Sequence, residues 1–146
     1  MHFKSGWALI LQVGLVLIIA VGVSYFYLQN QKSNYSTPDE LMFQLKLLCG
    51  NDDYQNVALN SLKYMSGNYQ LIDNSDIVRT NDDLSYLGAA NGLCREITSD
   101  STLMKKKISD TQWEYRYVFS SAISHTYEIT LFNNEWRVVL YKPMRL

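Results

Sequence analysis

The sequence has little of what most catalytic and metal-binding sites are made from. Its 146 residues include only two histidines and two cysteines. The cysteines lack the C-x-x-C spacing of thiol redox motifs, and a zinc site would need further Cys or His ligands. No group of residues forms a catalytic signature or a cofactor motif. We therefore expect no enzyme activity, no catalytic residues, no cofactor and no metal site.

A strong charge of either sign is also missing. The chain has 13 Lys and Arg against 14 Asp and Glu, for a net charge of −1. Nucleic-acid-binding proteins are usually distinctly basic, so we expect no nucleic-acid partner. The charges are unevenly distributed, because residues 38–100 hold ten acidic and four basic side chains and residues 101–146 hold four acidic and seven basic ones. Such an asymmetry can orient a domain towards a partner, although most charged faces are simply solvated.

The most distinctive segment that is present is one long apolar run. Residues 7–28 contain no charged side chain and a single strongly polar one, Gln12. A helix of this length spans about 33 Å, close to the hydrocarbon core of a bilayer at about 30 Å. Aromatic residues stand at both ends, as is typical of membrane interfaces. We expect a single-pass transmembrane anchor in contact with the lipid bilayer, preceded by a leader of residues 1–6 and followed by a linker of residues 29–36.

A cleaved signal peptide is the main alternative to this anchor. Ala20, Val21 and Gly22 form a weak cleavage site, but the apolar run exceeds the roughly 7–15 residues of a signal peptide. Lys4 on one side and Lys32 on the other give a small bias towards a cytoplasmic N-terminus. We therefore expect the protein in an inner (plasma) membrane, with residues 37–146 as an extracytoplasmic domain in a periplasm or an equivalent compartment.

Three residues of the anchor are candidates for association with another membrane helix. Gly14 and Gly22 lie on one helix face, where small residues allow close approach, and Gln12 can form a hydrogen bond to a neighbouring helix. The strict G-x-x-x-G spacing is missing, and Gly is common in membrane helices. The alternative is therefore that these residues are ordinary parts of a membrane-spanning helix and do not bind another helix.

The two cysteines, Cys49 and Cys94, predict a disulfide bond. In an exported domain an even number of cysteines indicates pairing, and these two would close a loop of 45 residues. Two buried free thiols are the alternative in a reducing compartment. The expected export of the domain favours the bond.

The first half of the domain predicts short amphipathic helices. Thr37, Pro38 and Glu40 have the pattern of a helix start, and an apolar face follows as far as Gly50. A second helix is expected over residues 54–66, ending before Gly67. A short third helix is expected over residues 84–90, and residues 93–98 fit a helix or a strand equally well.

The last third predicts an antiparallel sheet. Large apolar side chains, several of them aromatic, occupy alternate positions over residues 112–121, 127–131 and 136–140, and Asn133 and Asn134 suit a tight turn between the last two strands. We expect a three-stranded meander with one aromatic face, preceded by a basic run, residues 105–107, on an exposed edge. The side chains expected to line a cavity on that face are Trp113, Tyr115, Tyr117, Phe119, Trp136 and Val138.

Two or three helices followed by a curved antiparallel sheet that closes with Asn-Glu-Trp-Arg-Val-Val, residues 134–139, define an α+β fold. This order resembles the nuclear-transport-factor-like (cystatin-like) α+β cone. The resemblance implies that the helices pack on the concave face of the sheet, but it implies no function, because enzymes, ligand binders and assembly modules share this fold. One anchor followed by such a domain also looks like the bitopic assembly factors of type IV secretion systems.

Three functions are compatible with these features. The first is a membrane-anchored protein-interaction or assembly module of a cell envelope, which would contact another envelope protein. The second is an immunity or inhibitor protein against a secreted toxin. The third is a small-ligand-binding cone, or an enzyme built on it, in which His125 with Asp110 or Glu128 is the only acid–base pair that the sequence suggests.

Overall fold

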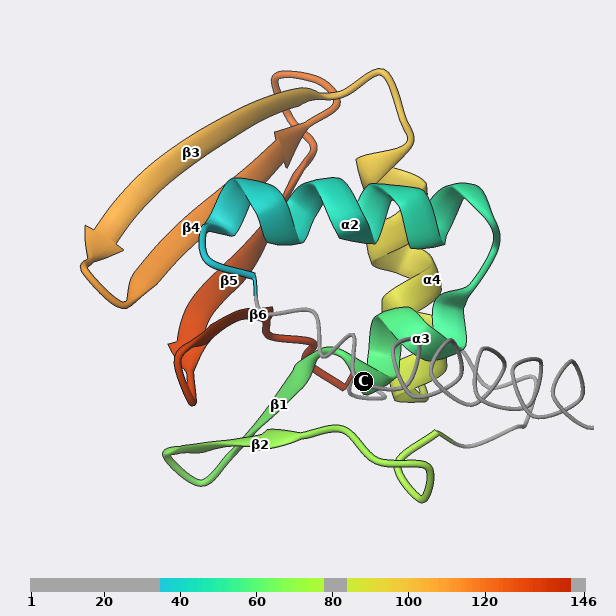
Figure 1. Cartoon of the computed structure of the whole chain (residues 1–146). Coiled ribbons are helices and arrows are strands. Elements are labelled where there is room, and N and C mark those ends of the chain that lie inside the picture. Colours follow the sequence, from blue (N-terminus) through green and yellow to red (C-terminus); the bar gives the residue numbers. More distant parts are fainter. Residues whose placement is uncertain (1–34, 78–83, 143–146) are drawn as a thin grey trace, which may run out of the picture. The chain divides into compact units, whose positions relative to one another are not determined.

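The computed structural model describes residues 35–77 and 84–142. This part of the chain is an α+β domain in which helices pack against antiparallel sheets (Figure 1), so the predicted fold class is confirmed at this level. Its elements are α2 Pro38–Gly50, α3 Tyr54–Leu59, β1 Leu62–Met65, β2 Asn68–Leu71, α4 Tyr86–Ile97, β3 Thr102–Ser109, β4 Gln112–Val118, β5 Ser124–Phe132 and β6 Glu135–Val138.

Helix α2 begins where the sequence predicts. Thr37 has extended backbone angles, and its hydroxyl oxygen accepts a hydrogen bond of 3.2 Å from the Glu40 amide. The Glu40 carboxylate in turn accepts a bond of 2.9 Å from the Ser36 amide, one residue further back than in an ideal capping box. The first of these bonds satisfies an amide that the first helical turn leaves unpaired. The helix buries Leu41, Met42, Leu45 and Cys49.

Helix α3 is shorter than predicted, because it ends at Leu59 and residues 62–65 form a strand. Arg137, from β6, donates hydrogen bonds of 3.0 and 3.2 Å to the backbone oxygen and the side-chain oxygen of Asn60. A cation at a helix C-terminus stabilises it, so this contact from a distant strand fixes the end of α3. The prediction of a helix over residues 54–66 was wrong after Leu59.

Strands β1 and β2 form a hairpin whose turn requires unusual backbone angles. Ser66 has φ of 50° and Gly67 has φ of 91°, so Gly67 supplies the conformation that other residues adopt at a cost. The hairpin joins the main sheet through Leu62, which forms a parallel bridge with Val139 and accepts a hydrogen bond of 2.8 Å from the Leu140 amide.

Helix α4 is longer than the predicted third helix and includes most of the segment that the sequence left open. It runs to Ile97, with Thr98 as its C-cap, so this part of residues 93–98 is helical. At its start the Ser85 hydroxyl accepts a bond of 3.1 Å from the Gly88 amide.

The main sheet has four antiparallel strands in the order β3-β4-β5-β6. The last three are the predicted meander, and the basic run forms part of an additional strand, β3, at the edge of the sheet (Figure 1). Asn133 and Asn134 have φ of 50° and 65°, as expected for the tight turn between β5 and β6.

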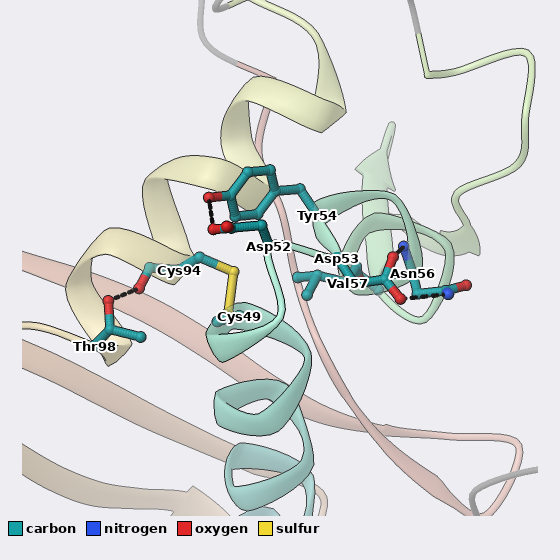
Figure 2. The surroundings of a disulfide bond; sticks show 9 residues. Cys49, Asp52, Asp53, Tyr54, Asn56, Val57, Cys94 and Thr98 are labelled. Atoms are coloured by element: carbon teal, nitrogen blue, oxygen red, sulfur yellow. Dashed lines mark hydrogen bonds between the residues drawn. A yellow bond between two sulfur atoms is a disulfide. The ribbon is translucent and has the colours of Figure 1, made fainter.

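A disulfide bond joins Cys49 to Cys94, as the sequence predicts (Figure 2). It connects the end of α2 to the last turns of α4, and the two Cα atoms are 5.1 Å apart. Both cysteines belong to the hydrophobic core, which also includes Val57 of α3 and Leu93 of α4. The bond therefore holds the helical half of the domain together across the loop that contains α3 and the β1–β2 hairpin.

The predicted anchor, leader and linker, and with them Gln12, Gly14 and Gly22, lie outside the described residues. Within residues 35–77 and 84–142, no helix is long and apolar enough to cross a membrane.

Candidate functional site

Strand β3 is an exposed edge of the main sheet. Within the described part of the chain it pairs only with β4, with an irregularity in the register between Lys107 and Ser109, and every one of its side chains is exposed. Three of these side chains are large and apolar: Leu103, Met104 and Ile108. An edge strand presents unpaired backbone N–H and C=O groups to another chain, so β3 is a place where a partner can add a strand.

The register between β3 and β4 places the side chains of β3 on two different faces. Leu103 and Lys105 lie opposite Tyr117 and Tyr115, on the face that the helices cover. Met104 and Lys106 alternate with them and therefore lie on the outer face of the sheet. Each face of this edge thus combines an apolar side chain with a lysine.

A cavity of about 360 Å³ lies between α2 and β3. Phe43 and Lys46 of α2 and Leu103 and Lys105 of β3 form opposite sides of it, and Tyr117 contributes from β4. Phe43 is 60% exposed, which is unusual for a large aromatic side chain. We call this cavity, together with the exposed side chains of β3, the α2–β3 surface.

Asp39 connects the two sides of this surface. Its carboxylate accepts a hydrogen bond of 2.7 Å from the Tyr115 hydroxyl and forms an ion pair with Lys105. The Lys105 ammonium also lies 5.4 Å from the centre of the Tyr115 ring. The hydrogen bond from Lys105, and to a smaller extent the one from Tyr115, lowers the pKa of Asp39. Burial of the Tyr115 hydroxyl and its hydrogen bond to the Asp39 carboxylate raise the pKa of Tyr115. Lys105 is thus held by its own chain.

The six side chains predicted to line a cavity have different environments. Tyr115 and Tyr117 line the cavity beside α2, and both are buried. Trp136 and Val138 are core residues, whereas Trp113 is partly buried and packs against the core. Phe119 is 41% exposed, just beyond the end of β4.

A second cavity, of about 590 Å³, lies between α4 and the beginning of β5. His125 stands on its wall, and His125 Nδ1 contacts the carboxylate of Glu96 from α4. The suggested pairing of His125 with Asp110 or Glu128 was therefore wrong. Asp110 forms an ion pair of 2.7 Å with Lys107, and Glu128 accepts hydrogen bonds from two tyrosine hydroxyls, those of Tyr69 and Tyr141.

Glu96 is the residue of this second cavity that the sequence reasoning missed. It lies among the buried residues of α4 and is itself only 8% exposed. Acidic side chains are rarely buried so deeply. The sequence signal that could have identified Glu96 is its position between the apolar residues Leu93 and Ile97, if this segment is a helix. That signal requires residues 93–98 to be assigned to a helix, which the sequence left open.

Comparisons of the chain with protein families, curated proteins and solved structures find no match. Among residues 35–77 and 84–142, no cluster of three or more His, Cys, Asp or Glu side chains suits a metal ion. The geometry of the two cavities and of the β3 edge is therefore the basis for a functional proposal.

Proposed function

We propose that this protein is a single-pass, membrane-anchored protein-interaction or assembly module of a cell envelope. Residues 7–28 span the membrane with the N-terminus in the cytoplasm, and the domain extends into the periplasm or an equivalent compartment. The observation that carries the interaction role is the exposed edge strand β3 beside the cavity between α2 and β3. The partner is another envelope protein.

The disulfide supports the location of the domain. Cys49 and Cys94 are bonded and buried in the core. Disulfides of this structural kind persist in oxidising compartments and are rare in the cytosol. A domain on the outer side of the membrane meets this condition.

We propose that the partner binds as an extended segment that adds a strand to β3. Backbone hydrogen bonds then supply affinity, and side chains at alternate positions supply specificity. Lysines at 105–107 discourage indiscriminate strand pairing, and they favour a segment that carries acidic residues. Lys105 and Lys107 already have acidic neighbours within the chain, so Lys106 is the lysine of the three best placed to select the partner.

The cavity in the α2–β3 surface gives the segment a second point of recognition. Phe43 and Leu103 offer apolar contact there, and Lys46 adds a positive charge. A segment that alternates acidic and apolar residues would match this surface, since its apolar side chains would reach the cavity and its carboxylates would reach the lysines.

Site-specific crosslinking from the full-length protein in its native membrane tests this proposal. A photo-crosslinking residue replaces Met104 on β3 or, as the matched control, Met65 on β1. Both methionines are exposed strand residues, at 57% and 49%. We expect position 104 to crosslink to an acidic extended segment of one envelope protein, mapped by mass spectrometry, and position 65 to give no such product.

A charge exchange makes the test specific. Lys106→Glu should abolish the crosslink from position 104, and a partner whose facing acidic residue is changed to Lys should restore it. Recovery of only the uncrosslinked monomer would contradict the proposal, as would equal crosslinking from positions 104 and 65. A crosslink that Lys106→Glu leaves unchanged would rule out an acidic partner strand.

A further inference from the structure

Three tyrosine rings gather where the β1–β2 hairpin meets the segment after β6. The centre of the Tyr64 ring lies 5.5 Å from that of Tyr69, in an edge contact, and 6.4 Å from that of Tyr141. In the register of the hairpin, Leu71 projects from the same face as Tyr64 and Tyr69. Tyr64, Leu71 and Tyr141 are 45%, 47% and 53% exposed. We call these three exposed side chains the tyrosine patch.

The carboxylate of Glu128 holds two of these rings in place. Its Oε2 accepts a hydrogen bond of 2.8 Å from the Tyr141 hydroxyl, and its Oε1 accepts one from the Tyr69 hydroxyl. Burial and the bond to Glu128 raise the pKa of Tyr69 to about 12, so its hydroxyl stays protonated and continues to donate. Each oxygen of Glu128 thus has a partner within the domain, whereas the exposed part of the cluster is aromatic and apolar.

Glu128 also fixes the side of the main sheet on which the patch lies. It is next to Tyr127 in β5, so the two side chains point to opposite faces of the sheet. Tyr127 lies opposite Tyr115, which is bonded to Asp39 of α2 and therefore faces the helices. The patch is thus on the outer side of the sheet, and Figure 1 shows the hairpin away from α2. The hairpin adjoins the residues after β6, at the opposite edge of the sheet from β3.

The two segments that supply the patch carry no acidic side chain. Residues 54–72 contain Lys63 as their only charged residue, and residues 139–146 contain Lys142 and Arg145. This is unusual for the chain, because residues 38–100 as a whole hold ten acidic and four basic side chains. Tyrosine is typical of membrane interfaces, where its ring lies among the headgroups, and basic side chains are attracted to anionic lipids. The composition of the patch therefore suits a lipid surface.

The chain that leads into the domain limits how far the patch can be from the membrane. The expected anchor ends at Leu28, and Tyr35 already belongs to the domain, where its carbonyl oxygen accepts a hydrogen bond of 3.2 Å from the Trp136 amide. Seven residues span at most about 25 Å when fully extended. Trp136 precedes Tyr141 by five residues, which span at most about 18 Å. The patch is therefore close to the point at which the chain enters the domain, within reach of the bilayer surface.

We propose that the tyrosine patch docks on the surface of the bilayer, with its rings and Leu71 among the headgroups and Lys142 beside the lipid phosphates. This inference rests on the proposed anchor, because the anchor holds the domain near the lipid. A patch of three side chains binds lipid weakly by itself, but a tethered patch meets the membrane at a high effective concentration. Docking through this edge of the sheet leaves β3, at the other edge, accessible to a partner.

Crosslinking to lipid from the full-length protein in vesicles tests the proposal. The vesicles consist of phosphatidylethanolamine and phosphatidylglycerol. A photo-crosslinking residue replaces Leu71 or, as the matched control, Leu47 of α2. The two leucines are 47% and 49% exposed, and they lie on opposite sides of the sheet. We expect position 71 to crosslink to lipid at least fivefold more than position 47.

Substitutions of Tyr64 and Lys142 separate the contributions of the ring and of the charge. Tyr64→Ser removes the exposed ring and leaves the bonds of Glu128 to the other two tyrosines, and it should lower the lipid crosslink from position 71 at least threefold. Tyr64→Trp should retain the crosslink, because Trp is also typical of membrane interfaces. Lys142→Glu should lower the crosslink in vesicles that contain phosphatidylglycerol and should have little effect in vesicles of phosphatidylcholine alone.

Flotation of the vesicles distinguishes failure of this inference from failure of the anchor. Protein that does not float with the vesicles would contradict the anchor and, with it, the docking. Protein that floats but crosslinks to lipid equally from positions 71 and 47 would overturn the docking alone, as would an unchanged crosslink in Tyr64→Ser. A crosslink from position 71 to a second copy of the chain in place of lipid would also overturn it, because the patch would then be an interface between copies.

Discussion

Individual side chains connect segments of the domain that are far apart in the sequence. Cys49 is bonded to Cys94 over 45 residues, and Asp39 reaches Tyr115 and Lys105 from the first turn of α2. The first contact is covalent and buried, whereas the second is an ion pair whose side chains remain 40% and 68% exposed. The two should therefore differ greatly in their contribution to stability.

We expect the disulfide to be the largest single contribution of this kind. Closing a loop of 45 residues lowers the entropy of the unfolded chain by an amount worth about 4 kcal/mol. Replacing both cysteines, as Cys49→Ala with Cys94→Ala, should lower the free energy of unfolding by about that amount, measured from urea midpoints in neutral detergent. The unchanged protein with reductant is the control and should lose a similar amount. An unaltered midpoint in both samples would contradict the prediction.

The contact of Asp39 with Lys105 and Tyr115 predicts a pH dependence. These hydrogen bonds lower the pKa of Asp39 in the folded protein. The stabilisation is therefore present above the usual Asp pKa of about 4 and disappears as the pH falls through the lowered pKa. Asp39→Asn should lower the free energy of unfolding at pH 7 by less than about 1 kcal/mol, as for exposed ion pairs.

The difference between Asp39→Asn and the unchanged protein should shrink as the pH is lowered towards 2, measured from urea midpoints across that range. Asp100→Asn is the control, since Asp100 is exposed and forms no ion pair among the described residues. Its midpoints should follow those of the unchanged protein. A difference for Asp39→Asn that is the same at pH 7 and pH 2 would rule out this role for the carboxylate.

Among the secondary-structure elements, those with local signals were predictable and those fixed by distant contacts were not. The start of α2 follows from Thr37, Pro38 and Glu40 alone, and the β5–β6 turn follows from two consecutive asparagines. The end of α3 depends on Arg137, which is 77 residues away from Asn60. The pairing of Glu96 with His125 likewise requires α4 to lie against β5, which no local pattern specifies.

The β1–β2 hairpin allows a paired test of backbone conformation. Gly67 has φ of 91°, which an L-residue adopts at a cost of roughly 1–2 kcal/mol. Gly67→Ala should therefore lower the free energy of unfolding by about that amount. Gly50→Ala, at the end of α2, should raise it by up to about 1 kcal/mol, because Ala is the better helix former. Urea midpoints of the two variants should move in opposite directions, and a shift in the same direction would contradict the assigned turn.

At the scale of the whole molecule, two separate parts of the chain support the proposed position of the domain outside the cytoplasm. The apolar run of residues 7–28 predicts a membrane anchor from its length and lack of charge. The domain independently contains a structural disulfide, which suits an oxidising compartment. The edge strand would then face that compartment, where it is available to a protein strand. The resemblance to the nuclear-transport-factor-like cone stays a prediction.

The anchor leads to a direct prediction for the mature protein. If residues 7–28 remain attached, carbonate extraction should leave the protein in the membrane fraction, because alkaline washing removes peripheral proteins and does not release a helix that crosses the bilayer. Sequencing the mature N-terminus should then show that cleavage has not occurred after Gly22. A variant with Leu15, Ile18 and Ile19 changed to Lys is the control and should be lost from the membrane, since each charge is costly at the centre of a bilayer. A soluble product that begins near Val23 would instead identify the run as a signal peptide, and it would leave the disulfide and the compartment of the domain unchanged.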